Sequence, residues 1–229
     1  MRKLNAPGDS VQDVFSTCIE SYRDAALKNR LRSIVPVLSD EASRFEDCVL
    51  TSKTHTIPTA DNVGGVVSKA EMLDIYESKF VKGTGRPYYD KYMSLPTNGK
   101  CPFCGIGTVS TLDHYLPKSK YPALAITPKN MIPACRDCNL GKKRTFSPQN
   151  SEEEPLHPYF DDVEQDIWLS VRFEVAGKEL VPTYFVRKPV AWNDLLFRRV
   201  ENHMVLYNLY TSYAVHAAEE ITGRSGIWH

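Results

Sequence analysis

The sequence predicts an α+β fold, in which mainly helical flanks surround a small core held together by cysteines and a short β-hairpin follows that core. Three observations predict this architecture. Apolar residues recur at three- and four-residue spacing near both ends, two Cys-x2-Cys pairs enclose the middle of the chain, and residues 167–175 alternate apolar and polar side chains. The expected regions are a helical N-terminal part at 1–99, a core at 100–146 and a C-terminal part at 147–229.

The N-terminal part contains three predicted helices. A capping box at Ser10 and Asp13 opens the first, whose apolar face continues to Ala26. The second spans residues 40–50, and residues 51–65 after it form a predicted loop. The third begins with a capping box at Ser68 and ends near Gly83. Two further cysteines lie in the first two of these helices, where we interpret them as small core residues: Cys18 and Cys48.

The C-terminal part contains a predicted hairpin followed by one long helix. Residues 167–175 read as a half-buried strand, and the sequence AGKE turns it into a second strand that starts at Leu180. The helix is expected from about Trp192 to Ile221, with an apolar face wide enough for burial in the core or under a partner chain.

The composition is that of a globular protein outside the membrane, with 42% hydrophobic and 24% charged residues. The N-terminus has no apolar run behind its basic residues, so no secretory signal is expected, and no window approaches the ~20 apolar residues of a membrane helix. We therefore expect a cytoplasmic protein with no membrane partner. Disulfides are not expected in a reducing cytosol, so the six cysteines require another explanation.

Four of the cysteines form two hooks, CPFC and CRDC, separated by 30 residues: Cys101, Cys104, Cys135 and Cys138. Four thiolates complete a tetrahedral zinc site without an open position, which is typical of a structural metal. Thiol redox chemistry is the alternative for a single Cys-x2-Cys pair, and two such pairs in one short segment disfavour it. We therefore predict a structural Zn2+ ion.

The segment between the hooks contains an acid and a histidine at the end of a predicted short strand, Asp113 and His114. A loop, a second short strand (MIPA) and a helix that starts at the second hook follow. Asn139 lies at the start of that helix. Two strands and a helix, joined at both ends by zinc, are expected to bring these three side chains together.

Charge is unevenly distributed, although the formal net charge is zero. Residues 118–145 carry seven lysines or arginines against one acid, and residues 147–171 carry seven acids with no lysine or arginine. A basic cluster beside a histidine suits a phosphate-rich ligand, with an ordinary solvated surface as the alternative. The basic residues predicted to contact nucleic acid are Lys118, Lys120, Arg136, Lys142, Lys143 and Arg144.

The residues LDHYLPKS…PKNMIPACRDCNLGKK resemble the HNH endonucleases, the ββα-metal nuclease family, in their four-cysteine variety. The resemblance implies a zinc-clasped ββα-metal nuclease core. It also implies that His114 is the general base, that Asp113 and Asn139 bind a catalytic Mg2+ or Mn2+ ion, that Asn130 braces the loop and that Lys142 binds phosphate. The chemistry agrees, because a neutral histidine accepts a proton from water and a divalent ion stabilises charge on a phosphodiester.

A narrower resemblance covers about residues 83–165. The sequences GRPYYD, DHYLPKSKYPALAITPKN and HPYFDD are similar to those of PtuB, the HNH subunit of Septu-type anti-phage defence systems, including those associated with retrons. It implies an ATPase partner subunit (PtuA-like) and a role in antiviral defence. The substrate is DNA or cellular RNA such as tRNA, since metal-bound water needs no 2′-hydroxyl. The alternative is a non-catalytic, zinc-clasped module that binds nucleic acid or protein. His157 is interpreted as structural.

Overall fold

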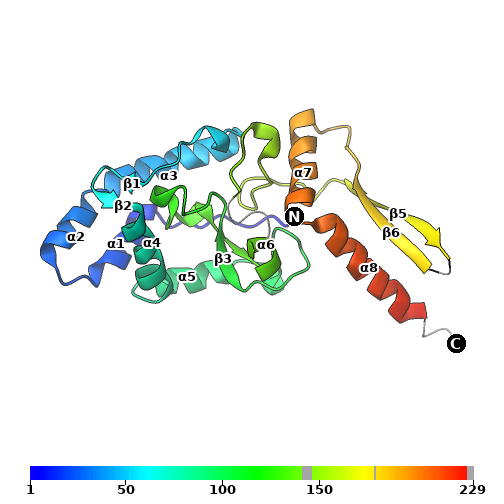
Figure 1. Ribbon diagram of the computed structural model, residues 1–229, viewed down its shortest axis with the longest axis horizontal. Helices are drawn as coiled ribbons and strands as arrows, with labels where there is room; N and C mark the ends of the chain where they lie inside the picture. The colour runs from blue at the N-terminus through cyan, green and yellow to red at the C-terminus, as the bar shows by residue number, and fades with distance from the viewer. Residues whose placement is uncertain (141–145, 178, 226–229) are drawn as a thin grey trace.

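A computed structural model describes residues 1–140, 146–177 and 179–225 of the chain (Figure 1). The described part is mostly helical with three two-stranded antiparallel sheets, which confirms the predicted α+β class. The α-helices are α1 (Val11–Glu20), α2 (Ala25–Arg32), α3 (Val35–Leu50), α4 (Lys69–Asp74), α5 (Arg86–Met93), α6 (Arg136–Leu140), α7 (Asp194–Leu206) and α8 (Leu209–Ser225). The sheets pair β1 (Asn62–Val63) with β2 (Val67–Ser68), β3 (Thr111–His114) with β4 (Met131–Ala134), and β5 (Leu169–Ala176) with β6 (Glu179–Val186).

The predicted start of the first N-terminal helix is confirmed, but the predicted lengths of the first two helices are not. The Ser10 hydroxyl accepts the Asp13 N–H at 3.1 Å, which confirms the first cap. The helix then ends at Glu20 instead of continuing to Ala26, because the Asp24 carboxylate accepts the N–H groups of residues 26 and 27 and starts α2. The next helix, α3, begins at Val35 and so extends the predicted 40–50 segment toward the N-terminus.

The capping box predicted at Ser68 is complete. Ser68 and Glu71 exchange both hydrogen bonds of the motif at the start of α4, which continues into the π-helix η2 (Ile75–Val81). Helix α5 was not predicted, and Gly85 precedes it because a side chain there would lie 2.6 Å from the Cys18 sulfur. Cys18 is fully buried, and burial raises the pKa of its thiol to about 12, so its interpretation as a core residue is confirmed.

The central hairpin β3–β4 lies between two hydrophobic clusters, with Asp113 opposite Ile132 and His114 opposite Met131. Leu112 and Met131 pack with the helices of the N-terminal half, whereas Ile132 packs with the cysteines and α7. Successive strand residues point to opposite faces, so a short hairpin reaches both clusters. The hairpin and the following helix α6 are the elements that carry the predicted site.

The C-terminal part confirms the hairpin and corrects two expectations. The strand predicted to be half-buried exposes its apolar residues, including Phe173 at 52% and Val175 at 76%. The single long helix is two helices, because Asn208 adopts a left-handed conformation with φ of 53° between α7 and α8. Figure 1 shows β5, β6 and α8 extending together from one end of the molecule.

Short 3-10 helices connect several of these elements: η1 (Thr54–Thr56), η3 (Thr97–Gly99), η4 (Pro122–Leu124), η5 (Pro128–Asn130) and η7 (Ser151–Glu153). The first of them and the β1–β2 ribbon interrupt the segment 51–65 that was predicted as a loop. Among the residues that the structure describes, no helix has the length and apolar character needed to cross a membrane.

Candidate functional site

The two cysteine hooks meet in a buried cluster, as the sequence predicted. The four Sγ atoms of Cys101, Cys104, Cys135 and Cys138 all lie within 4.8 Å of one another. The Cys104 and Cys135 sulfurs are 3.8 Å apart, which is too long for a disulfide bond. Tetrahedral zinc with Zn–S bonds of ~2.3 Å places its sulfurs ~3.8 Å apart. The donor set and its spacing therefore fit a structural Zn2+ ion.

Gly107 permits the close approach of the two hooks. Its N–H donates to the Cys104 sulfur at 3.3 Å, and its carbonyl accepts the Cys101 N–H at 2.8 Å. A Cβ atom at this position would lie 2.8 Å from both Cβ and Sγ of Cys135. Because real Cβ atoms do not approach so closely, position 107, three residues after Cys104, has to lack a side chain.

The C-terminal helices hold the first hook from the other side. His203 on α7 donates from Nε2 to the Phe103 carbonyl at 2.9 Å, and the Tyr213 hydroxyl on α8 donates to the Cys104 carbonyl at 2.8 Å. Neither contact was expected from the sequence. Both donors lie about a hundred residues from their acceptors, so no local motif signals them.

His114 lies at the end of β3, and a backbone contact fixes its ring. Its Nε2 lies 2.8 Å from the Ala125 carbonyl oxygen. Since a carbonyl only accepts hydrogen bonds, Nε2 carries the proton, and the lone pair of the neutral ring is on Nδ1. The Tyr76 ring from η2 packs edge-on against the imidazole at 4.8 Å between centroids. This tautomer is the one that accepts a proton at Nδ1.

Asp113 and His114 are both recessed, with exposures of 7% and 8%. The Asp113 carboxylate accepts the His114 N–H at 2.7 Å, so it folds back over the end of the strand. Asn139 is half-buried on α6, which contacts β3, and its N–H donates to the Cys135 carbonyl at 3.1 Å. The second hook thus directly positions the helix turn that carries Asn139. Carboxylate and amide oxygens form a donor set that suits Mg2+ or Mn2+.

Asn130 is fully buried and closes the loop between the two strands. Its Oδ1 accepts the Leu116 N–H at 2.8 Å, and its Nδ2 donates to the carbonyls of Leu116 and Leu124 at 3.1 and 3.0 Å. Leu124 directly precedes the residue whose carbonyl holds His114. These three hydrogen bonds tie the two ends of the loop together, and the role of Asn130 in a catalytic site stays a prediction.

Three of the predicted basic residues can be placed. The Lys118 ammonium lies 3.9 Å from the centre of the Tyr76 ring and 3.3 Å from Glu77, and burial lowers its pKa. Lys120 donates to the Ser147 hydroxyl at 3.2 Å, and Arg136 is exposed on α6. Lys142, Lys143 and Arg144 lie outside the described residues.

The acidic segment is partly used inside the fold. Asp161 binds both terminal nitrogens of the buried Arg199 on α7, at 2.9 and 2.7 Å, and the Glu154 carboxylate lies 3.0 Å from His55 Nδ1. His157 is fully buried among aromatic rings and donates its backbone N–H to Asp161 at 2.7 Å. Its structural interpretation fits these contacts.

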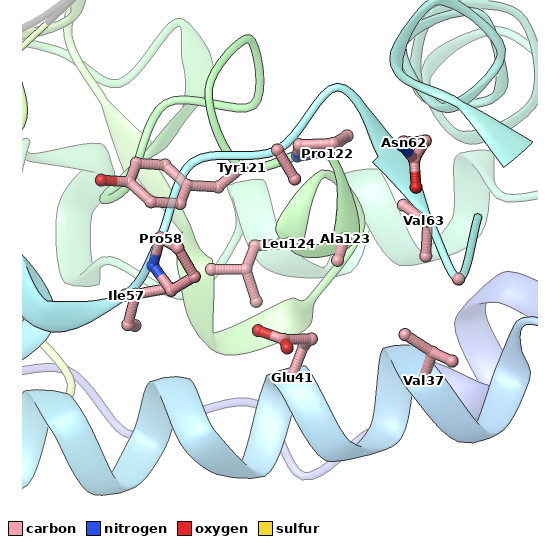
Figure 2. A pocket seen from close by; sticks show the side chains of 12 residues that line it. Val37, Glu41, Ile57, Pro58, Asn62, Val63, Tyr121, Pro122, Ala123 and Leu124 are labelled. Atoms are coloured by element: carbon pink, nitrogen blue, oxygen red, sulfur yellow. The ribbon is translucent and has the colours of Figure 1, made fainter.

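An apolar pocket of about 130 Å³ lies between α3 and the loop that carries Leu124. Figure 2 shows Leu124 and Ala123 on one side of the pocket and Glu41 and Val37 of α3 on the other. None of its lining residues belongs to the predicted catalytic set, so the pocket is separate from the predicted site.

Comparison with known proteins shows distant similarity. The chain is 28% identical to protein ea31 of Escherichia phage lambda over 243 aligned residues, covering 98% of this chain and 80% of ea31. It is 31% identical to Septu protein PtuB of Bacillus thuringiensis over 102 residues, which cover 42% of this chain and 38% of PtuB. No family model and no solved structure matches. The chain is thus similar to ea31 along its length and to the Septu protein PtuB over part of it.

Proposed function

We propose that this protein is a metal-dependent HNH endonuclease that hydrolyses phosphodiester bonds in nucleic acid. The observation that carries the proposal is the hydrogen bond of His114 Nε2 to the Ala125 carbonyl, 2.8 Å, which leaves the basic lone pair on Nδ1. The antiparallel pair β3–β4 and helix α6 supply the ββα arrangement, with Asp113 on the first strand and Asn139 on the helix. The cysteine cluster connects the strands and the helix at their ends.

In the proposed reaction, His114 removes a proton from the attacking water at Nδ1. The Ala125 carbonyl then stabilises the imidazolium through the proton on Nε2. Asp113 and Asn139 would hold the Mg2+ or Mn2+ ion, which supplies positive charge for the phosphate and the leaving oxygen. Asn130 keeps the loop and therefore the Ala125 carbonyl in place. Lys118 and Arg136 add positive charge beside the site for the polyanion.

The similarity to the Septu protein PtuB supports a role in anti-phage defence with an ATPase subunit as partner. The substrate is DNA or cellular RNA, since the same water attack serves both polymers. The second candidate function is a non-catalytic, zinc-bound module, which the recessed position of Asp113 and His114 favours. The complete set of base, oxygen ligands and loop brace favours the nuclease.

A cleavage assay separates the two candidates. The protein, alone and with a PtuA-like ATPase subunit, is incubated with duplex DNA, single-stranded DNA and total cellular RNA in Mg2+ or Mn2+. His114→Ala should abolish cleavage of one polymer while keeping bound zinc and the folded state. The matched control is His216→Ala, since this side chain is 61% exposed on α8, and it should cleave like the wild type. Equal cleavage by His114→Ala and wild type would reject the assigned base.

A further inference from the structure

The outer edge of β5 is a long and open strand edge. Strand β5 runs for eight residues and, within the described part of the chain, has only β6 as a ladder partner. Helix α8 packs against β6, and among the residues that the structure describes, residues 171–175 of β5 are all exposed. Figure 1 shows the hairpin extending beyond the body of the protein. An unpaired strand edge presents backbone N–H and C=O groups to any strand that can match it.

The side chains along this edge are apolar on one face and charged on the other. Val171, Phe173 and Val175 share one face and are 38%, 52% and 76% exposed. Arg172 and Glu174 share the opposite face, where their side chains are 66% and 64% exposed and lie 3.5 Å apart. This alternation is typical of strands that pack one face against another part of a protein. Here the apolar face remains largely in solvent.

The sequence of the strand is complementary to itself. In an antiparallel pair centred on Phe173, Val171 of one copy lies opposite Val175 of the other, and the two Phe173 rings meet on the two-fold axis. Arg172 then lies opposite Glu174 of the second copy, and the reverse pair forms on the other side of the axis. Opposite charges and large apolar residues in directly opposed positions stabilise antiparallel strands. A two-fold axis makes every such contact twice.

We propose that β5 pairs in this register with β5 of a second copy of the chain, which joins two hairpins into a four-stranded antiparallel sheet. The charge pattern favours a second β5 as the strand that pairs with this edge. A strand whose charges all have one sign would place a like charge opposite either Arg172 or Glu174. The contact is small, which places it among weak, concentration-dependent interfaces. The inference is independent of the proposed nuclease activity.

Charge reversal tests the pairing. Sedimentation velocity across a wide concentration range should show a reversible dimer for the full-length wild type. Arg172→Glu and Glu174→Arg should each raise the dimer dissociation constant about tenfold, equivalent to ~1.4 kcal/mol, because each puts like charges opposite one another. The double variant Arg172→Glu with Glu174→Arg should restore dimerisation. Circular dichroism and zinc content verify that each variant is folded. A wild type that stays monomeric, or a double variant no better than the singles, overturns the proposal.

Cysteine cross-linking tests the register. Opposed Cα atoms in an antiparallel pair are ~4.5–5.5 Å apart, within the ~4.4–6.8 Å span of a disulfide. Phe173→Cys should therefore form a disulfide-linked dimer on mild oxidation. The matched variant Val175→Cys has a valine opposite it in the proposed register and should not. Equal cross-linking of the two variants, or none with Phe173→Cys beyond the wild-type background, contradicts the register centred on Phe173.

Discussion

Replacing Asn130 by alanine tests whether its side chain stabilises the loop that holds His114. The change removes three hydrogen bonds of 2.8, 3.1 and 3.0 Å and leaves the Leu116 N–H buried without its acceptor. An orphaned buried donor costs ~1–3 kcal/mol, and each lost bond to a carbonyl adds ~0.5–1.5 kcal/mol. The expected loss of unfolding free energy is therefore about 2–6 kcal/mol, a large share of the ~5–15 kcal/mol typical of a domain.

Urea unfolding followed by circular dichroism, with zinc bound throughout, measures this loss. The matched control is Thr127→Val in the same loop. Thr127 is also buried, but its hydroxyl has no hydrogen-bond partner among the described residues. Its loss should therefore leave stability unchanged or slightly increased. If Asn130→Ala changes the unfolding free energy no more than Thr127→Val does, the assignment of Asn130 as a brace is wrong.

Three further outcomes follow from particular contacts. Gly107→Ala should weaken zinc binding at least ~tenfold in a chelator competition, because the new methyl group would lie 2.8 Å from the Cys135 sulfur. Arg199→Met should cost ~3–5 kcal/mol in urea unfolding by stranding a carboxylate that the guanidinium holds at 2.7 Å, and a loss below ~1 kcal/mol would contradict this. The hydrogen bond from Arg30 lowers the pKa of Glu71 from 4.5 to about 2, so its stabilisation is present above pH 4.5 and is lost as pH falls toward 2. Glu71→Gln should therefore be less stable than wild type near neutrality, and the difference should vanish at acid pH.

The features that short sequence patterns encode were predictable. The N-caps Ser10 and Ser68, the two cysteine hooks and the strands around His114 were placed correctly because each depends on residues a few positions apart. The break after Glu20 depends on the Asp24 cap, a single-residue signal that the continuous apolar stripe obscured. The break at Asn208 has no glycine or proline to mark it, although asparagine tolerates the left-handed conformation.

Contacts between distant segments were not predictable from local patterns. The partner of His114 Nε2 is a backbone carbonyl of an alanine, which carries no side-chain signal. Tyr76 belongs to the apolar face of the helix after Ser68, and only the fold reveals that this face ends against the imidazole. The strand β5 was predicted to be half-buried, but its apolar face is exposed. The alternation of apolar and polar residues indicates a strand with two different faces, but it does not show whether anything packs against the apolar one.

The position of the β3–β4 hairpin between two hydrophobic clusters limits how the protein can be dissected. A peptide that contains only residues 101–138 would retain every zinc ligand. It would, however, expose to water three side chains that are buried in the full chain: Leu112, Ile126 and Met131. The free energy of zinc binding alone would then have to offset the cost of exposing this apolar surface to water. A minimal fragment of this protein therefore needs the N-terminal helices to cover the apolar face of the hairpin. Truncation from the N-terminus would lower the solubility of the protein before it removed any zinc ligand.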